Sequence, residues 1–200
     1  QEGANVEVIA IHGNFDDAQS AVKRIFTDEA TRASLDKDGM MLSSANSINW
    51  GRLAPQIAYY VSAYCDMVKA GTIKQGDKIN VCVPTGNFGN ILAAYIAKQM
   101  GLPVNKFICA SNRNNVLTDF FKKDGEYDRN RDFYTTTSPS MDILISSNLE
   151  RLLFFASGFD DKMVSELMTK LNTEGRYKVA SEVFAKINAD FDAGCCDDEH

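Results

Sequence analysis

The chain has 200 residues, a length that is typical of one domain and sufficient to bury a hydrophobic core. Its composition, with 44% hydrophobic and 24% charged residues, is that of an ordinary globular protein and excludes a disordered or fibrous chain. The formal net charge of -6 argues against a surface that neutralises nucleic-acid phosphates. No apolar run approaches the roughly 20 residues that cross a bilayer, so we expect neither a nucleic-acid nor a membrane partner.

The histidines and cysteines give little support for a metal site or a hydrolase triad. The two histidines are His12 and His200, and no C-x-x-C motif occurs. Cys82 and Cys109 lie in apolar runs that predict buried strands, and Cys65 lies in a helical pattern. We therefore expect no metal, buried free thiols in a reducing compartment, and a cytoplasmic location.

The first half of the chain begins with a short β-branched run. Residues 6–11 predict a strand, and a turn with a helix-start signal at Asn14 leads into apolar residues at helical spacing over residues 15–26. A second helical series occupies residues 57–68 and ends at Gly71.

The clearest unit follows in the middle of the chain. Residues 79–84 predict a buried strand, residues 85–90 a loop, residues 91–100 a helix, and residues 106–110 a further strand. A strand, a helix and a strand in this order imply a right-handed crossover between parallel strands.

The second half of the chain is mainly helical in its pattern. Residues 116–121 predict a short helix, residues 125–132 a polar loop and residues 133–136 a short strand, and helical spacing dominates residues 141–193.

These patterns together predict a three-layer α/β fold. We expect one domain over residues 1–200, with a mostly parallel sheet of about four strands within residues 4–140 and helices on both of its faces.

The loop after the central strand carries two glycines. Gly86 and Gly89 let the backbone approach a ligand closely, and the N–H groups of the following helix point into the same space, which suits a phosphate. The loop has neither the lysine of a Walker motif nor the third glycine of a dinucleotide fingerprint. From spacing alone, a phosphate site and a tight turn required by packing are both open.

Three sequence blocks occur in a fixed order along the chain. They read N-S-I-N-W-G-R-L over residues 46–53, P-T-G-N-F-G-N over residues 84–90, and T-S-P-S-M-D-I over residues 137–143 with a continuation to residue 152. In content and order they resemble the threonine synthases, which are pyridoxal-phosphate enzymes of the tryptophan synthase β-like fold, also called fold type II. The resemblance extends from residue 3 to about residue 193.

The resemblance implies a cofactor site in the second block. The phosphate of pyridoxal phosphate would be held by backbone N–H groups, the helix dipole and asparagine side chains; the residues are Gly86, Asn87, Phe88, Gly89 and Asn90. The structural alternative is that Asn87 and Asn90 only cap the helix and that Phe88 packs in the core.

The resemblance also implies a substrate site in the first block. Asn46, Ser47 and Arg52 match positions that contact the phosphate of O-phospho-L-homoserine, and a guanidinium fork beside neutral donors suits a dianion. The alternative is that Arg52 pairs with a surface carboxylate and that Asn46 and Ser47 cap the following helix. Charged residues of the third block are expected to act as helix-start charge and a solvated ion pair; they are Asp142, Glu150 and Arg151.

No residue of this chain is expected to be catalytic. In threonine synthases the lysine linked to the cofactor lies in a Phe-Lys-Asp context upstream of the first strand predicted here. Lys122 lies in a similar context but follows the phosphate loop, so the family's order of motifs excludes it. The resemblance therefore implies an internal piece of a lyase of threonine biosynthesis, inactive without the remainder of the parent chain.

For the parent enzyme, the resemblance implies conversion of O-phospho-L-homoserine and water to L-threonine and phosphate. The alternatives are another pyridoxal-phosphate lyase, such as a threonine or serine dehydratase, and a non-catalytic phosphate-binding module. The block over residues 46–53 favours threonine synthase over a dehydratase, because a dehydratase handles no substrate phosphate.

Overall fold

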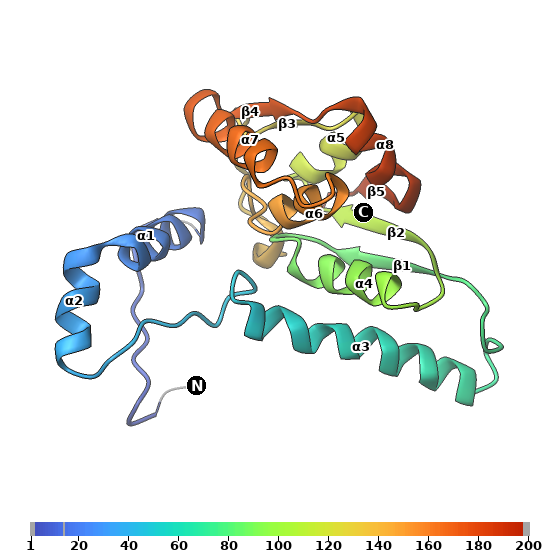
Figure 1. Ribbon diagram of the computed structural model, residues 1–200, viewed down its shortest axis with the longest axis horizontal. Helices are drawn as coiled ribbons and strands as arrows, with labels where there is room; N and C mark the ends of the chain where they lie inside the picture. The colour runs from blue at the N-terminus through green and yellow to red at the C-terminus, as the bar shows by residue number, and fades with distance from the viewer. Residues whose placement is uncertain (1–2, 14, 198–200) are drawn as a thin grey trace. The chain divides into compact units, whose positions relative to one another are not determined.

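The computed structural model describes residues 3–13 and 15–197 (Figure 1). The chain divides into two compact units, Gln1–Ser43 and Ser44–His200. That residues 1–200 form one domain of a larger protein stays a prediction.

The first unit contains two helices, α1 (Phe15–Thr27) and α2 (Glu29–Lys37). The strand predicted over residues 6–11 is wrong, because in the described part of the unit this segment has only an isolated bridge at Val6 and no pairing strand. A strand needs a hydrogen-bonding neighbour, whatever its β propensity. Helix α2 has no buried residue and therefore no apolar periodicity, which explains why the sequence pattern missed it. Asn14 lies outside the described residues.

The second unit is built on a three-stranded parallel sheet. Its strands are β1 (Ile79–Pro84), β2 (Val104–Ser111) and β5 (Phe191–Cys195), in the order β1-β2-β5. Helix α4 (Gly89–Gln99) connects β1 to β2 and contacts both strands. The predicted strand-helix-strand unit and the α/β fold class with a parallel sheet are confirmed.

The remaining elements surround this sheet. They are α3 (Trp50–Lys69), α5 (Val116–Lys122), the 3-10 helix η1 (Pro139–Met141), α6 (Leu149–Ala156), α7 (Asp161–Glu174), α8 (Ser181–Asp190), and an antiparallel pair formed by β3 (Glu126–Asp128) and β4 (Arg176–Lys178). Helix α3 packs on α4, while α5 and α8 contact β2 and β5.

Three predictions for the second half of the chain are wrong. Residues 133–136 form no strand, β3 lies inside the segment predicted as a polar loop, and β5 lies in the segment predicted as helical. Strand β5 reads F-D-A-G-C, without a single β-branched residue, so nothing local marks it as a strand. The described residues thus form a parallel sheet of three strands instead of about four.

An aromatic cluster joins the sheet to the helices around it. The ring centroid of Phe191 in β5 lies 5.1 Å from that of Phe107 in β2 and 5.4 Å from that of Phe121 in α5. Phe88 and Tyr95 extend the cluster to α4. Aromatic pairs at such distances add to the stabilisation from apolar burial. The cluster therefore anchors the start of α4, which is where the central loop ends.

The cysteines differ in burial according to strand position. Cys109 lies in the central strand β2, and its burial raises the pKa of the thiol to about 12. Cys82 was predicted to be buried but is exposed, because it lies with Asn80 and Pro84 on the exposed face of β1, whereas Val83 lies on the opposite face and is buried.

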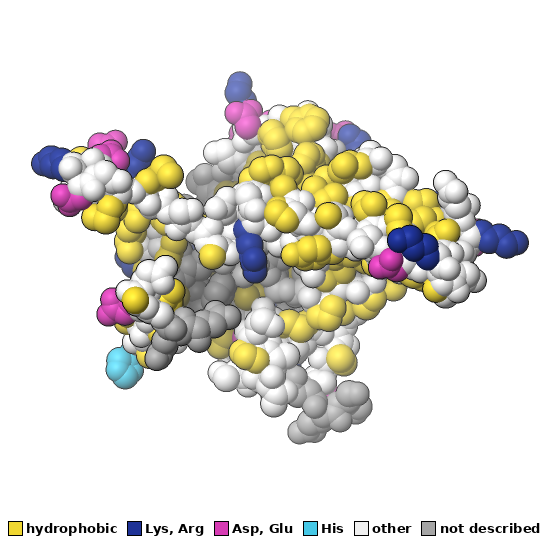
Figure 2. Space-filling model, turned by 90° about the horizontal axis from the view of Figure 1, so that it is seen from below, with side chains coloured by type: hydrophobic (Ala, Val, Ile, Leu, Met, Phe, Trp, Pro, Cys, Tyr) yellow, Lys and Arg dark blue, Asp and Glu magenta, His cyan; other side chains and the backbone are white. Residues whose placement is uncertain are grey.

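Hydrophobic side chains are also exposed at the surface, as the face shown in Figure 2 illustrates. On α3, Leu53 and Tyr64 are buried, whereas Trp50, Tyr59 and Val61 are exposed. None of the helices in the described ranges combines the length and the hydrophobicity needed to cross a membrane.

Candidate functional site

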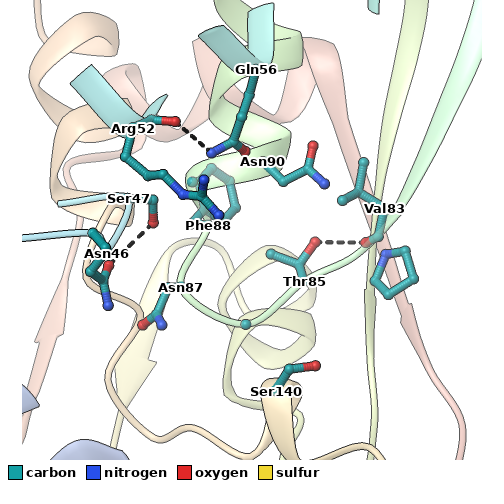
Figure 3. A pocket seen from close by; sticks show the side chains of 14 residues that line it. Asn46, Ser47, Arg52, Gln56, Val83, Thr85, Asn87, Phe88, Asn90 and Ser140 are labelled. Carbon is teal, nitrogen blue, oxygen red and sulfur yellow. Dashed lines mark hydrogen bonds between the residues drawn. The ribbon is translucent and has the colours of Figure 1, made fainter. Parts of the chain in front are cut away.

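A cavity of about 300 Å³ lies in the second unit where three chain segments meet (Figure 3). The segments are residues 45–56 before and within α3, residues 83–90 at the end of β1, and Ser140 in η1. All eight residues predicted as binding residues line it, namely Asn46, Ser47, Arg52, Gly86, Asn87, Phe88, Gly89 and Asn90. Two blocks that lie about 40 residues apart in the sequence are therefore brought to one site.

The loop over residues 85–90 leads from the carboxyl end of β1 into α4. Phe88 has a φ of 63° in the left-handed region and a buried side chain in the aromatic cluster, so it turns the chain into the helix. The backbone N–H groups of residues 86–90 have no hydrogen-bond acceptor within the described chain. Five such donors at a helix N-terminus form a cradle for an anion.

Both glycines of the loop are required by close approach. A Cβ atom on Gly86 would lie 2.5 Å from the carbonyl oxygen of Ser140, and one on Gly89 would lie 2.5 Å from Oγ of Ser47. Neither glycine has a positive φ, so the need for glycine comes from the neighbouring segments and not from backbone strain. The cradle is consequently narrow, with its walls formed by the other two segments of the cavity.

The two asparagines of the loop keep their amide N–H groups available. Oδ1 of Asn87 accepts a hydrogen bond from Oγ of Ser147 at 3.3 Å, and Oδ1 of Asn90 accepts one from the Tyr60 hydroxyl. Each Nδ2 atom is left without a protein acceptor in the described residues, so both side chains can donate to an anion. Neither side chain caps α4, which has Phe88 at its N-cap, and the capping alternative is wrong.

The segment before α3 presents a third asparagine in the same way. Oδ1 of Asn46 accepts the backbone N–H of Ile48 at 3.1 Å, which leaves Nδ2 of Asn46 as a donor. Ser47 donates to the same Oδ1 atom over a long 3.4 Å. Asn49, and neither Asn46 nor Ser47, caps α3, because its Oδ1 atom accepts the N–H of Gly51 at 2.9 Å.

Arg52 extends from the first turn of α3 toward the loop (Figure 3). Its guanidinium has no acceptor and no carboxylate partner among the described residues, so the surface ion-pair alternative is wrong for this part of the chain. Among the residues that the structure describes, it is the one charged side chain of the cavity lining, and none of them contributes a carboxylate to it. A free guanidinium beside a row of N–H donors selects for anions.

Three polar residues of the lining were missed by sequence reasoning. Gln56 lies four residues after Arg52 on the same face of α3 and donates to its carbonyl oxygen at 2.9 Å, so helical spacing could have found it. Thr85 lies in the loop that was predicted. Ser140 carries no local signal, because it reaches the cavity from another segment.

Lys122, which resembled the cofactor lysine in context only, lies away from the cavity. Its Nζ atom pairs with Asp192 at 2.6 Å on an exposed surface. No lysine lines the cavity within the described residues, and none of their His, Cys, Asp and Glu side chains form a group that could hold a metal.

Asp142 directly follows η1, the short helix that brings Ser140 to the cavity. It was expected to be a helix-start charge, but it is buried and accepts hydrogen bonds from Nδ2 of Asn112 at 2.8 Å, Nδ2 of Asn114 at 3.0 Å and Oγ1 of Thr136 at 2.7 Å. Burial alone would raise the pKa of this carboxyl group, but the hydrogen bonds from Thr136, Asn112 and Asn114 together lower the pKa. The network joins the turn that contains Ser140 to the segment after β2, and the carbonyl oxygen of Ser140 lies close to Gly86 of the loop.

The fold and the site together define an α/β protein with a cavity, lined by N–H donors and a guanidinium group, at the carboxyl end of a parallel strand. No family model matches the chain. It is 50% identical over 190 residues to threonine synthase-like 1 from Homo sapiens. This alignment covers 94% of the present chain and 25% of the human protein. It is 40% identical over 197 residues to threonine synthase from Pseudomonas aeruginosa, covering 98% of this chain and 39% of that protein.

A solved structure gives the same result. The pyridoxal-phosphate-bound threonine synthase from Brucella melitensis is 42% identical, with a TM-score of 0.77 over 92% of this chain and 37% of that chain. The chain is therefore homologous to a segment of the threonine synthases and has their fold, and the resemblance predicted from the sequence is confirmed. It spans 25% of the human relative and 39% of the bacterial one.

Proposed function

We propose that this chain is part of a pyridoxal-phosphate-dependent threonine synthase that converts O-phospho-L-homoserine and water to L-threonine and phosphate in the cytoplasm. The observation that carries the proposal is the meeting of two anion-binding donor sets in one cavity without a carboxylate. One set consists of the N–H groups of residues 86–90, and the other contains Arg52.

The loop fits the phosphate of the cofactor. Backbone N–H groups of Gly86, Asn87, Phe88, Gly89 and Asn90 would donate to its oxygens, with the positive end of the α4 dipole adding to the attraction. Bound there, pyridoxal phosphate supplies an electron sink for negative charge that develops on substrate carbons.

The segment before α3 fits the phosphate of the substrate. Arg52 supplies a guanidinium fork and Asn46 an amide N–H, which together match a phosphate dianion. The Ser47 hydroxyl, whose bond to Asn46 is long at 3.4 Å, can turn to the same anion. These residues hold and orient the substrate, so that the bond to its phosphate lies at one place relative to the cofactor.

Proton transfer at the substrate carbons requires a base that the cavity lining of this chain does not contain. We assign that role to a lysine in the remainder of the parent chain, which is the partner that completes the site. A phosphate dianion on the substrate is also what separates this function from a dehydratase, since a substrate without phosphate would leave Arg52 unpaired.

The test uses the parent protein, purified with its cofactor and supplied with O-phospho-L-homoserine. Phosphate and threonine are measured separately, and the proposal requires that they appear in equal amounts. Phosphate without threonine would instead identify a lyase that does not add water, and the relatives named threonine synthase-like make this arm worth measuring. Neither product, with phosphate binding retained, would identify a binding module.

A further inference from the structure

The start of α6 connects the two anion-binding segments of the cavity. Asn148, the N-cap residue of α6, and Arg151 lie one helical turn apart, and Nη1 of Arg151 donates to Oδ1 of Asn148 at 2.8 Å. Both side chains reach back to segments that lie about 60 and 100 residues earlier in the chain.

Arg151 binds the backbone of the segment before α3. Its Nη1 atom donates to the carbonyl oxygen of Ser47 at 3.0 Å, and its Nη2 atom donates to the carbonyl oxygen of Ile48. The expected solvated ion pair is wrong, because within the described residues Arg151 forms none. A planar guanidinium can hold two successive carbonyl groups at once, whereas a lysine ammonium cannot match this geometry.

Asn148 binds both segments. It is completely buried, and its Nδ2 atom donates to Oγ of Ser47 at 3.0 Å and to the carbonyl oxygen of Asn87 at 2.9 Å. Its backbone N–H donates to the same Asn87 oxygen at 3.0 Å. A buried amide with all these contacts is costly to disturb, so it fixes the position of Ser47 relative to the loop.

We propose that Asn148 and Arg151 are positioning residues that set the distance between the two phosphate sites. The inference rests on the proposed function, in which the loop holds the cofactor phosphate and the segment before α3 holds the substrate phosphate. Neither residue lines the cavity, so each acts through the segments it holds. The spacing of two phosphates determines which substrate atom meets the cofactor, and a small misplacement lowers the rate strongly.

Arg151 and Asn148 contact different segments, so the proposal predicts different binding defects for their variants. Arg151 contacts the substrate segment and Asn148, whereas Asn148 contacts the substrate segment and the loop. Loss of Arg151 therefore weakens the substrate site and spares the cofactor site, while loss of Asn148 weakens both.

The experiment compares Arg151→Met, Arg151→Lys and Asn148→Ala in the full parent protein. For Arg151→Met we expect KM for O-phospho-L-homoserine to rise at least about tenfold, with the dissociation constant of the cofactor, measured by dialysis and absorbance, within about threefold of wild type. Arg151→Lys should give an intermediate KM, because one ammonium reaches one carbonyl group at a time. Asn148→Ala should raise KM and the cofactor dissociation constant together.

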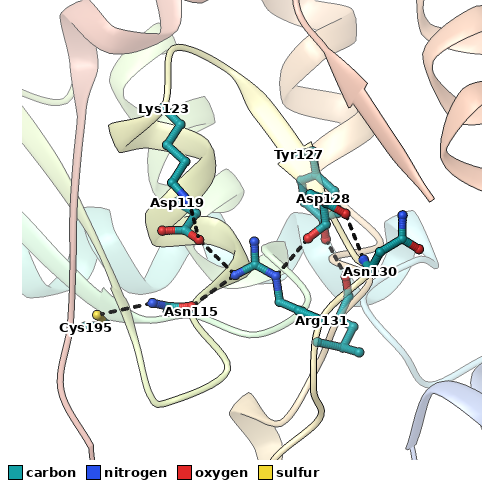
Figure 4. A network of polar contacts seen from close by, with 9 residues as sticks. Asn115, Asp119, Lys123, Tyr127, Asp128, Asn130, Arg131 and Cys195 are labelled. Carbon is teal, nitrogen blue, oxygen red and sulfur yellow. Dashed lines mark hydrogen bonds and ion pairs between the residues drawn. The ribbon is translucent and has the colours of Figure 1, made fainter. Parts of the chain in front are cut away.

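Arg131→Met is the matched control (Figure 4). Arg131 is a partly buried arginine of the same unit that donates to the carbonyl oxygen of Asp128 at 2.8 Å, to Oδ1 of Asn115 at 3.1 Å and to Asp119 at 2.9 Å. It does not touch the cavity or its segments. Arg131→Met should lower Tm by an amount similar to Arg151→Met and leave both binding constants unchanged.

The proposal is overturned if Arg151→Met and Arg151→Lys lower Tm but leave KM within about twofold of wild type, as the control does. Calorimetric titration of the cofactor-loaded proteins with inorganic phosphate provides a second reading that needs no turnover. If the wild-type parent forms no threonine, the proposed function fails, but a weaker phosphate affinity in Arg151→Met than in Arg131→Met still supports the positioning role. Equal phosphate affinity in these two variants overturns it.

Discussion

The loop over residues 86–90 and the segment over residues 46–52, which we propose as the two phosphate sites, present their donors by different means. The loop offers backbone N–H groups, which every residue type except proline possesses, and needs glycine where Ser47 and Ser140 approach. The segment offers the side chains of Asn46 and Arg52, while Arg151 binds the backbone carbonyl groups of Ser47 and Ile48 and Asn148 binds the Ser47 hydroxyl. A backbone site is therefore vulnerable to added bulk, and a side-chain site to the loss of a functional group.

The largest effect should follow from adding one methyl group to the loop. Gly89→Ala places Cβ against Ser47, and the shift of the loop should weaken cofactor binding about 100-fold, the equivalent of roughly 3 kcal/mol. Gly194→Ala is the control, because a Cβ atom there meets nothing within 4 Å. Equilibrium dialysis of the parent protein against the cofactor measures both variants. Equal cofactor affinities in Gly89→Ala and Gly194→Ala would contradict the idea that the backbone site is vulnerable to added bulk.

The next effect tests the side-chain site. Arg52→Ala should raise KM for the phosphorylated substrate about 10- to 100-fold, since a charge-assisted hydrogen bond contributes about 1.5–3 kcal/mol. The absorbance of the bound cofactor should not change, because no hydrogen bond joins Arg52 to the loop within the described residues. Steady-state kinetics and a spectrum of the same sample provide the two readings. If Arg52→Ala also lost cofactor absorbance, the substrate site and the cofactor site would not be independent.

A third prediction concerns the hydrogen-bond network of the buried Asp142 carboxylate. Asp142→Asn should lower the free energy of unfolding by about 1–3 kcal/mol at pH 7, because an amide N–H then faces the donors that now bind the carboxylate. The folded-state pKa of Asp142 lies below its ordinary value of 3.8, so this stabilisation is present at higher pH and disappears as the pH falls through the folded-state pKa. Denaturant unfolding at pH 7 and pH 3 should show the difference between variant and wild type narrowing in acid.

The smallest effect should come from the amide of Asn90. Tyr60→Phe removes the hydroxyl that donates to Oδ1 of Asn90 and frees the amide to rotate. One neutral hydrogen bond is worth about 0.5–1.5 kcal/mol, so cofactor affinity should fall about two- to tenfold. Tyr59→Phe is the control, since Tyr59 is the adjacent residue of α3 and its side chain is exposed. An affinity loss as large as that of Gly89→Ala would mean that side chains, and not the backbone, dominate the loop.

The sequence predicted those elements whose signals are local. Residues 79–84 form a strand as expected because β2 lies beside them, whereas the equally β-branched residues 6–11 have no neighbour and form none. Strand β5 pairs with β2 despite a sequence without β propensity. A pattern of side chains records the preference of a segment, but pairing decides whether a strand forms.

The residues of the site were found from their sequence blocks, and the contacts between blocks were not. From the spacing of Gly86 and Gly89, close approach of a ligand and a turn required by packing were both open; the structure shows close packing by Ser140 and Ser47 and leaves the ligand a prediction. The role proposed for Arg151 could not be predicted, because two of its three acceptors lie more than 100 residues away and are backbone carbonyl groups, which every residue has.

The reactivity of the Cys109 thiol reports whether the central strand β2 is folded. While β2 is folded, burial keeps the thiol protonated at neutral pH, with its pKa at about 12, and therefore unreactive toward alkylating reagents. The other four cysteines of the chain, Cys65, Cys82, Cys195 and Cys196, are exposed. A pulse of iodoacetamide should thus label the four exposed cysteines at once and Cys109 only at the rate at which the sheet opens. Mass spectrometry of the labelled chain can therefore follow local unfolding of the sheet without the introduction of a new cysteine.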